Sequence, residues 1–124
     1  GYLRPLTLAL KCLSRGGNAV QILFFDEIDA GISATVAGAI AERLSLLGSD
    51  HQVFVITHMP VIAAAADTHY LVEKKVLGND TLVAITPVSG EKRKEELSRM
   101  LGGNEREARD YAEKLLKTKG RINK

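Results

Sequence analysis

The sequence predicts an α/β fold with a mainly parallel sheet flanked by helices, an antiparallel strand pair and a helical C-terminus. Two observations lead to this fold class. Two apolar runs with a helical pattern between them predict a βαβ unit and therefore a parallel strand pair. Further along, two strand-like runs flank Gly78-Asn79-Asp80, as in an antiparallel hairpin. The 124 residues, 45% of them hydrophobic, suffice for one buried core.

The first element is expected to be a helix over residues 4–14. Its leucines recur at three- and four-residue spacing, and Pro5 suits a first helical turn. Gly16 and Gly17 would end it.

The βαβ unit is expected to follow. Residues 20–26 form an apolar run without alternation, which is typical of a central strand covered on both faces. A helix over about 34–47, ended by Gly48, leads to a second buried strand over 51–57. The crossover between the two strands is expected to be right-handed.

The second half of the chain is expected to hold short elements. A short helix opens at Met59-Pro60, and the hairpin follows it. Two helices complete the chain, over about 91–101 and 105–117, with Asn104 as the cap of the second. We therefore expect one folded lobe over 1–117 and a flexible tail over 118–124.

Composition and charge exclude several classes of protein. No apolar run approaches the ~20 residues that span a bilayer, so no membrane association is expected. Cys12 is the only cysteine, which excludes an internal disulfide and fits a cytoplasmic protein. Residues 91–124 carry 11 basic and 7 acidic residues; a solvated helical surface or a weak attraction to nucleic acid would both explain this excess.

Polar side chains follow both predicted parallel strands. Asp26 and Glu27 end the first strand, and Thr57 and His58 end the second. Because the carboxyl ends of parallel strands meet at one edge of a sheet, these side chains are expected to gather there. Asp26 and Glu27 alternate to opposite faces, so one acid can hold a Mg²⁺ shell while the other orients water.

An apolar strand that ends in Asp-Glu is the Walker B pattern of ATPases in which the Glu is the catalytic base, and His58 could hydrogen-bond a γ-phosphate. A Gly-rich loop ending in Gly-Lys-Ser/Thr is absent from the sequence. The phosphate-binding loop is therefore expected upstream of these residues, and the isolated chain is expected to have little or no ATPase activity.

The order of these motifs resembles the C-terminal part of the ATPase head of the RecN family. RecN proteins act in bacterial DNA double-strand-break repair and belong to the structural-maintenance-of-chromosomes (SMC) group of ABC ATPases, whose heads are P-loop NTPases. The resemblance extends to about residue 117. It is carried by three stretches: "FFDEIDAGIS", "VFVITHMPVIAAAADTHYLVEK" and "RKEELSRMLGG".

The resemblance implies a role for each site residue. Asp26 would hold Mg²⁺, Glu27 would polarise the attacking water, and His58 would sense the γ-phosphate of ATP. Three residues would form the D-loop that touches a second head: Asp29, Gly31 and Ser33. The implied partners are a second head in a homodimer, the upstream N-terminal lobe of the same protein, and DNA for the intact, nucleoid-associated protein.

The start of the chain departs from the family signature, and other readings remain open. Tyr2, Arg4 and Pro5 stand where the family has Glu, Ser and Arg. One alternative is a non-catalytic dimerisation or DNA-contact lobe. The other is the nucleotide-binding domain of an ABC transporter.

Overall fold

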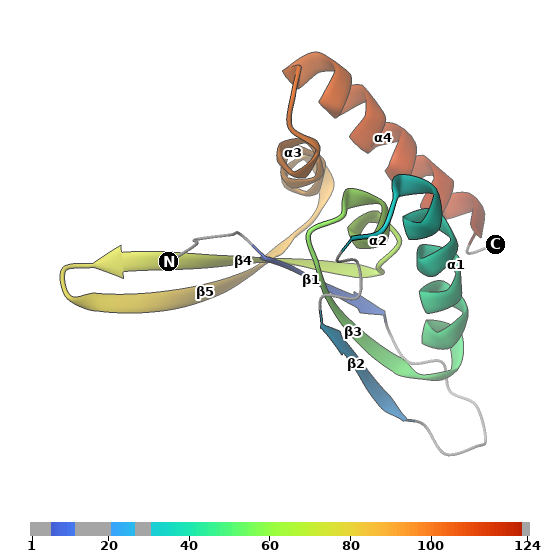
Figure 1. Ribbon diagram of the computed structural model, residues 1–124, viewed down its shortest axis with the longest axis horizontal. Coiled ribbons are helices and arrows are strands. Elements are labelled where there is room, and N and C mark those ends of the chain that lie inside the picture. The colour runs from blue at the N-terminus through green and yellow to red at the C-terminus, as the bar shows by residue number, and fades with distance from the viewer. Residues whose placement is uncertain (1–5, 12–20, 27–30, 123–124) are drawn as a thin grey trace.

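The computed structural model describes residues 6–11, 21–26 and 31–122. Five strands form one sheet in the order β2-β3-β1-β4-β5, and Figure 1 shows the four helices on one side of it. The strands are β1 (Leu6–Lys11), β2 (Ile22–Asp26), β3 (Gln52–Thr57), β4 (Thr68–Leu77) and β5 (Asp80–Val88). The helices are α1 (Ala34–Asp50), α2 (Pro60–Ala64), α3 (Gly90–Leu101) and α4 (Glu105–Ile122).

The α/β class is confirmed, but the expectation of a mainly parallel sheet is wrong for the strands described. Only β2 and β3 pair in parallel. The contacts of β1 with β3, of β1 with β4, and of β4 with β5 are all antiparallel. Strands β2, β3 and β4 run in the same direction. Strand β1 lies between β3 and β4 and runs in the opposite direction.

The predicted helix over 4–14 is also wrong where the structure describes it, because residues 6–11 form β1. Leucines stand at every second position here, at 6, 8 and 10, which equally suits a strand. The expected helix over 4–14 is shorter than the roughly 12–15 residues that an isolated helix needs in water. As a strand between β3 and β4, the segment has hydrogen-bonding partners on both edges.

The βαβ unit is confirmed, with α1 running three residues past its expected end. The expected position of its first strand is wrong, since β2 lies at the edge of the sheet and not in its centre. Leu23 and Phe25 pack against the core below α1, whereas Ile22 and Phe24 are 74% and 62% exposed. Within this structure β2 is therefore covered on one face only.

The core lies between the sheet and the helices in two adjoining clusters. In the first, α1 and α2 pack on β3 through Ala37, Ala41, Ile62, Val53 and Val55. In the second, Ala63 and Ala64 of α2 contact Leu97 of α3 and Ala112 of α4. The two faces of α2 thus join the sheet to the outer pair of helices.

The C-terminal half follows its prediction closely. The β4–β5 hairpin turns at Gly78, which has the positive φ of 63° that favours glycine, and it projects beyond the helices (Figure 1). The Asn104 Oδ1 accepts hydrogen bonds from the backbone N–H groups of Arg106 and Glu107, at 3.0 and 3.4 Å, as a helix cap does. Helix α4 continues to Ile122, past its expected end at 117. The division into a lobe over 1–117 and a flexible tail over 118–124 stays a prediction.

Candidate functional site

Asp26 and His58 leave the sheet at the same end of its parallel strand pair. Asp26 is the last residue of β2 and pairs with Ile56, two positions before His58. Both side chains are exposed. The juxtaposition of strand ends expected from the sequence is therefore present, and it presents a carboxylate and an imidazole at one rim.

The turn that carries His58 is fixed by its neighbours. Thr57 is 1% exposed, and its hydroxyl oxygen accepts a hydrogen bond of 3.0 Å from the Met59 backbone N–H. Pro60 then begins α2, at a position where the missing N–H costs no hydrogen bond. The buried Thr57 and the start of α2 at Pro60 thus fix the backbone on both sides of the exposed His58.

Gly31 and Ser33 lie just before α1. Gly31 has a φ of 75°, a left-handed conformation that strains other residues. The Ser33 hydroxyl accepts a hydrogen bond of 3.4 Å from the Val36 backbone N–H and so caps α1. Both residues have a structural explanation in this chain, and their expected contact with a second head stays a prediction.

Glu27 and Asp29 lie outside the residues that the structure describes, so their expected roles stay predictions. Of the expected metal site, the structure describes only Asp26. In the described ranges, no group of three or more histidine, cysteine or acidic residues is placed so that it could hold a metal ion. A single exposed carboxylate nevertheless fits Mg²⁺, which keeps several waters and takes one or two carboxylates together with phosphate oxygens.

Two polar side chains, one buried and one half-buried, were not predicted from the sequence. His69 is fully buried, and neither of its ring nitrogens has a hydrogen-bond partner. Burial and, secondarily, the charge of Arg93 lower the His69 pKa from 6.5 to about 4, so the ring is neutral at pH 7. Arg93 donates from Nη2 to the main-chain oxygens of Ala63, Ala64 and Ala66, at 3.1, 3.2 and 2.7 Å.

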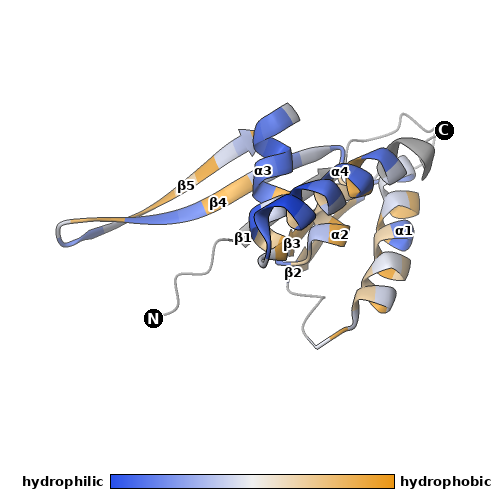
Figure 2. Cartoon of the chain, turned by 90° about the horizontal axis from the view of Figure 1, so that it is seen from above, coloured by the Kyte–Doolittle hydropathy of each residue, from blue (hydrophilic) through white to orange (hydrophobic). Residues whose placement is uncertain are grey.

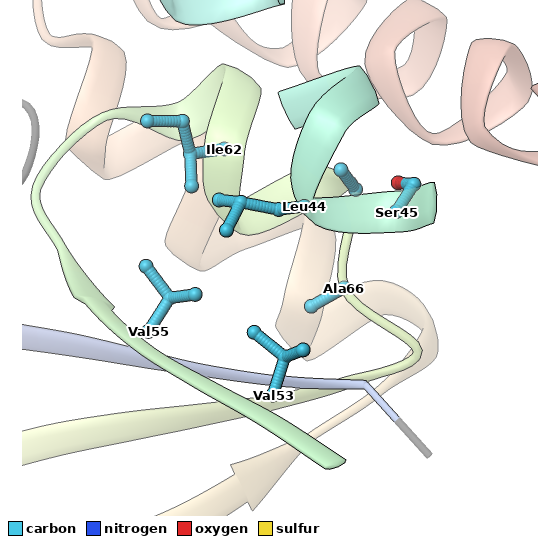
Figure 3. Close-up of a pocket in the computed structure, with 7 residues that line it drawn as sticks. Leu44, Ser45, Val53, Val55, Ile62 and Ala66 are labelled. Atoms are coloured by element: carbon cyan, nitrogen blue, oxygen red, sulfur yellow. The ribbon is translucent and has the colours of Figure 1, made fainter. Parts of the chain in front are cut away.

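The cavity shown in Figure 3 is part of the core and not a ligand site. It lies among side chains of α1, β3 and α2 that point toward one another, with Leu44, Val53, Val55 and Ile62 among them. Its volume is about 20 Å³ and its lining is almost wholly apolar. A space of that size holds no more than a water molecule and excludes a nucleotide.

Several known proteins similar to this chain carry the same name. A "DNA repair protein RecN" from Deinococcus radiodurans is 47% identical over 117 residues, which are 94% of this chain. The RecN of Streptomyces coelicolor is 42% identical over 120 residues, and that of Treponema pallidum is 41% identical over 123. The chain belongs to the RecN family. No family model matches it.

The chain corresponds to only a segment of a RecN protein. It spans about a fifth of the length of the curated relatives it matches: 20% of the Deinococcus protein, 21% of the Streptomyces protein and 22% of the Treponema protein. The three matches cover 94%, 95% and 98% of this chain, respectively. Within the described part of the chain, none of the helices has the length and apolar character needed to cross a membrane.

Proposed function

We propose that this chain is part of an ATP-hydrolysing head of a RecN-type DNA repair protein. In this proposal the intact head is an SMC-like P-loop NTPase, and its phosphate-binding loop lies outside these 124 residues. The observation that supports it is the parallel register of β2 and β3, with Asp26 opposite Ile56 and His58 directly after β3. A carboxylate can bind the metal of a metal–nucleotide complex, and an imidazole can donate a hydrogen bond to its γ-phosphate.

Each residue at the rim has a distinct proposed role. Asp26 binds to the Mg²⁺ shell through its exposed carboxylate, and His58 donates a hydrogen bond toward the γ-phosphate. Glu27, the next residue along the chain, accepts a proton from the attacking water. Asp29, Gly31 and Ser33 contact the second head. Mg²⁺, when bound with ATP, neutralises charge on the phosphates.

The proposed partners follow from the segment's place in a larger protein. A second copy of the head pairs with the first as a homodimer, and the N-terminal lobe of the same protein supplies the phosphate-binding loop. DNA is the proposed partner of the intact protein, because its relatives are DNA repair proteins. We place the intact protein in the cytoplasm, with the nucleoid.

ATP turnover by the intact protein tests this proposal. Glu27→Gln is expected to lower turnover by roughly 100-fold or more, the usual contribution of a general base, while ATP binding is retained. Glu42→Gln, on the exposed side of α1, is the matched control and is expected to leave turnover unchanged. If wild-type turnover is already as slow as that of Glu27→Gln, the catalytic proposal fails.

Two histidines provide a second comparison. His58 and His51 flank β3 at opposite ends, and the His51 Nδ1 accepts a hydrogen bond of 3.3 Å from the Gln21 backbone N–H. His58→Gln is expected to lower turnover, and His51→Gln is expected to leave it near the wild-type value. Equal effects of the two changes would argue against a special role for the rim that carries His58.

A further inference from the structure

The helix that follows His58 depends on the rest of the molecule for its position. Helix α2 has five residues, Pro60–Ala64, which is far fewer than the roughly 12–15 residues that an isolated helix needs in water. Its N-cap residue, Met59, makes no side-chain capping hydrogen bond. The direction in which α2 leaves the turn at His58 is therefore set by tertiary contacts.

Apolar packing places α2 but does not fix its direction. Ile62 is 2% exposed and belongs to the first core cluster, while Ala63 and Ala64 belong to the second. Figure 2 shows that α2 is apolar along most of its length, whereas α3 is largely hydrophilic. Because apolar contacts are non-directional and alanine side chains are small, they leave the rotation of so short a helix weakly determined.

Arg93 of α3 supplies a directional contact at the C-terminal end of α2. Its Nη2 donates to the main-chain oxygens of Ala63, Ala64 and Ala66, at 3.1, 3.2 and 2.7 Å. Helix carbonyl groups point toward the C-terminal end of a helix and favour a cation there. Since three oxygens converge on one nitrogen, the end of α2 is fixed relative to α3.

The charge of Arg93 lies where water is partly excluded. Burial is the main influence on the Arg93 pKa and lowers it, while the charge of Asp67 raises it. Removing a cation from water costs stability unless hydrogen bonds offset that cost. The carbonyl groups at the end of α2 provide these bonds, so Arg93 is not an incidental surface charge.

The peptide groups of Ala63 connect this contact to the turn at His58. The Ala63 oxygen accepts from Arg93, and the Ala63 N–H donates to the Met59 oxygen at 3.1 Å. The Met59 N–H in turn donates to the Thr57 hydroxyl oxygen. Both main-chain groups of the residue after His58 are therefore hydrogen-bonded, one to the end of β3 and the other to the helix that Arg93 holds.

We propose that Arg93 is a positioning residue for His58. Through Ala63 and Met59 it fixes the main chain from which the imidazole projects at the rim of the sheet. Arg93 acts on the reaction only through this main chain. The inference rests on the proposed function, because the position of the imidazole affects turnover only if His58 takes part in it.

A double-mutant cycle in the intact protein tests the inference. Arg93→Met is expected to lower ATP turnover by about tenfold and to leave ATP affinity near the wild-type value, because a misplaced catalytic group costs rate more than binding. In a His58→Gln background, the same change is expected to lower turnover by less than about twofold. Lys92→Met, at an exposed position of α3, is the matched control and is expected to leave turnover unchanged.

The cycle separates positioning from a general loss of folded protein. A smaller folded fraction lowers turnover by the same factor in both backgrounds. Equal losses with and without the His58 imidazole would therefore overturn the inference.

Hydrogen exchange of the same intact proteins measures the contact without turnover. Arg93→Met is expected to accelerate exchange in the segment 58–66 by about tenfold, because these amides would open locally. Arg93→Lys, which keeps a cationic donor, is expected to fall between wild type and Arg93→Met. Helix α1 is the internal reference and is expected to keep its wild-type exchange. Unchanged exchange in 58–66, or equal acceleration in α1, would overturn the inference.

The two measurements distinguish a failure of this inference from a failure of the ATPase proposal. If His58→Gln turns over ATP as fast as wild type, the proposed role of His58 fails, and faster exchange confined to 58–66 in Arg93→Met would still support the contact that holds the turn. If turnover depends on His58 but Arg93→Met keeps wild-type exchange, the proposed function stands and Arg93 is rejected as the positioning residue.

Discussion

Arg93, on α3, donates from Nη2 to the main-chain oxygen of Ala66 at 2.7 Å, two residues past the end of α2. The same nitrogen reaches the oxygens of Ala63 and Ala64. The Ala63 oxygen also accepts a hydrogen bond of 3.3 Å from the Ala66 backbone N–H. The half-buried Arg93 guanidinium adds a charged donor at the C-terminal end of α2, where helix carbonyls favour a cation. Because α2 begins two residues after His58, the contact also ties the candidate site to the C-terminal helices.

Replacing Arg93 with Met should lower the free energy of unfolding by about 2–4 kcal/mol, since it leaves buried carbonyl oxygens without a charged donor. Lys92→Met, at an exposed position of the same helix, should change it by less than about 0.5 kcal/mol. Urea titration of the chain measures both. Similar midpoints for the two variants would show that the contact contributes little.

His69 should make the fold sensitive to mild acid. Its pKa is about 4 in the folded chain and near 6.5 when unfolded, so the unfolded state binds the proton first as the pH falls. The neutral His69 ring therefore keeps the folded state at its full stability above about pH 6.5, and this stability is lost as the pH falls toward 4. Between pH 7 and 5, the free energy of unfolding should decrease by about 2 kcal/mol.

Unfolding of wild type and His69→Leu at pH 7 and 5 measures this contribution as a difference. The leucine variant should lose about 2 kcal/mol less than wild type over that range. Parallel pH profiles for wild type and His69→Leu would contradict the prediction.

Thr57→Val should release the turn that carries His58. Valine keeps the buried volume but removes the oxygen that accepts from the Met59 N–H, at a cost of about 1–2 kcal/mol. Hydrogen exchange at the Met59 amide should therefore accelerate in Thr57→Val and stay slow in Thr57→Ser, which keeps the hydroxyl. Unchanged exchange in the valine variant would mean that another group protects this amide.

Gly31→Ala should destabilise the chain by about 1–2 kcal/mol, because the left-handed backbone at this position strains a residue with a Cβ. Gly38, inside α1, is the matched control, since an added Cβ would have no atom within 4 Å at either glycine. Gly38→Ala should stabilise the helix by about 0.5–1 kcal/mol. The midpoint temperature of thermal unfolding should therefore fall in Gly31→Ala and rise in Gly38→Ala. A shift of both midpoints in the same direction would rule out backbone strain at Gly31 as the cause.

The elements that could be predicted from sequence are those with local signals. Gly78-Asn79-Asp80 marks the hairpin, Asn104 marks the start of α4, and the spacing of apolar residues marks α1. The parallel orientation of β2 and β3 follows from their βαβ connection, and so Asp26 and His58 could be assigned to one rim in advance.

The elements that could not be predicted depend on contacts distant in sequence. Residues 6–11 carry leucines that suit either a helix or a strand, and only their pairing with β3 and β4 decides the outcome. His69 has no signal of burial in its own neighbourhood. Its lowered pKa arises from packing below helices and from Arg93, which is 24 positions away in the sequence.

The position of β1 makes the early part of the chain essential to sheet continuity. Among the described strands, β3 and β4 are joined only through residues 6–11. Without that segment the sheet would divide into a two-stranded parallel ribbon and a two-stranded hairpin, and each is below the size at which strand pairs are stable alone. Cooperative unfolding of the hairpin with the rest of the molecule therefore depends on residues 6–11, which are distant from the hairpin in the sequence.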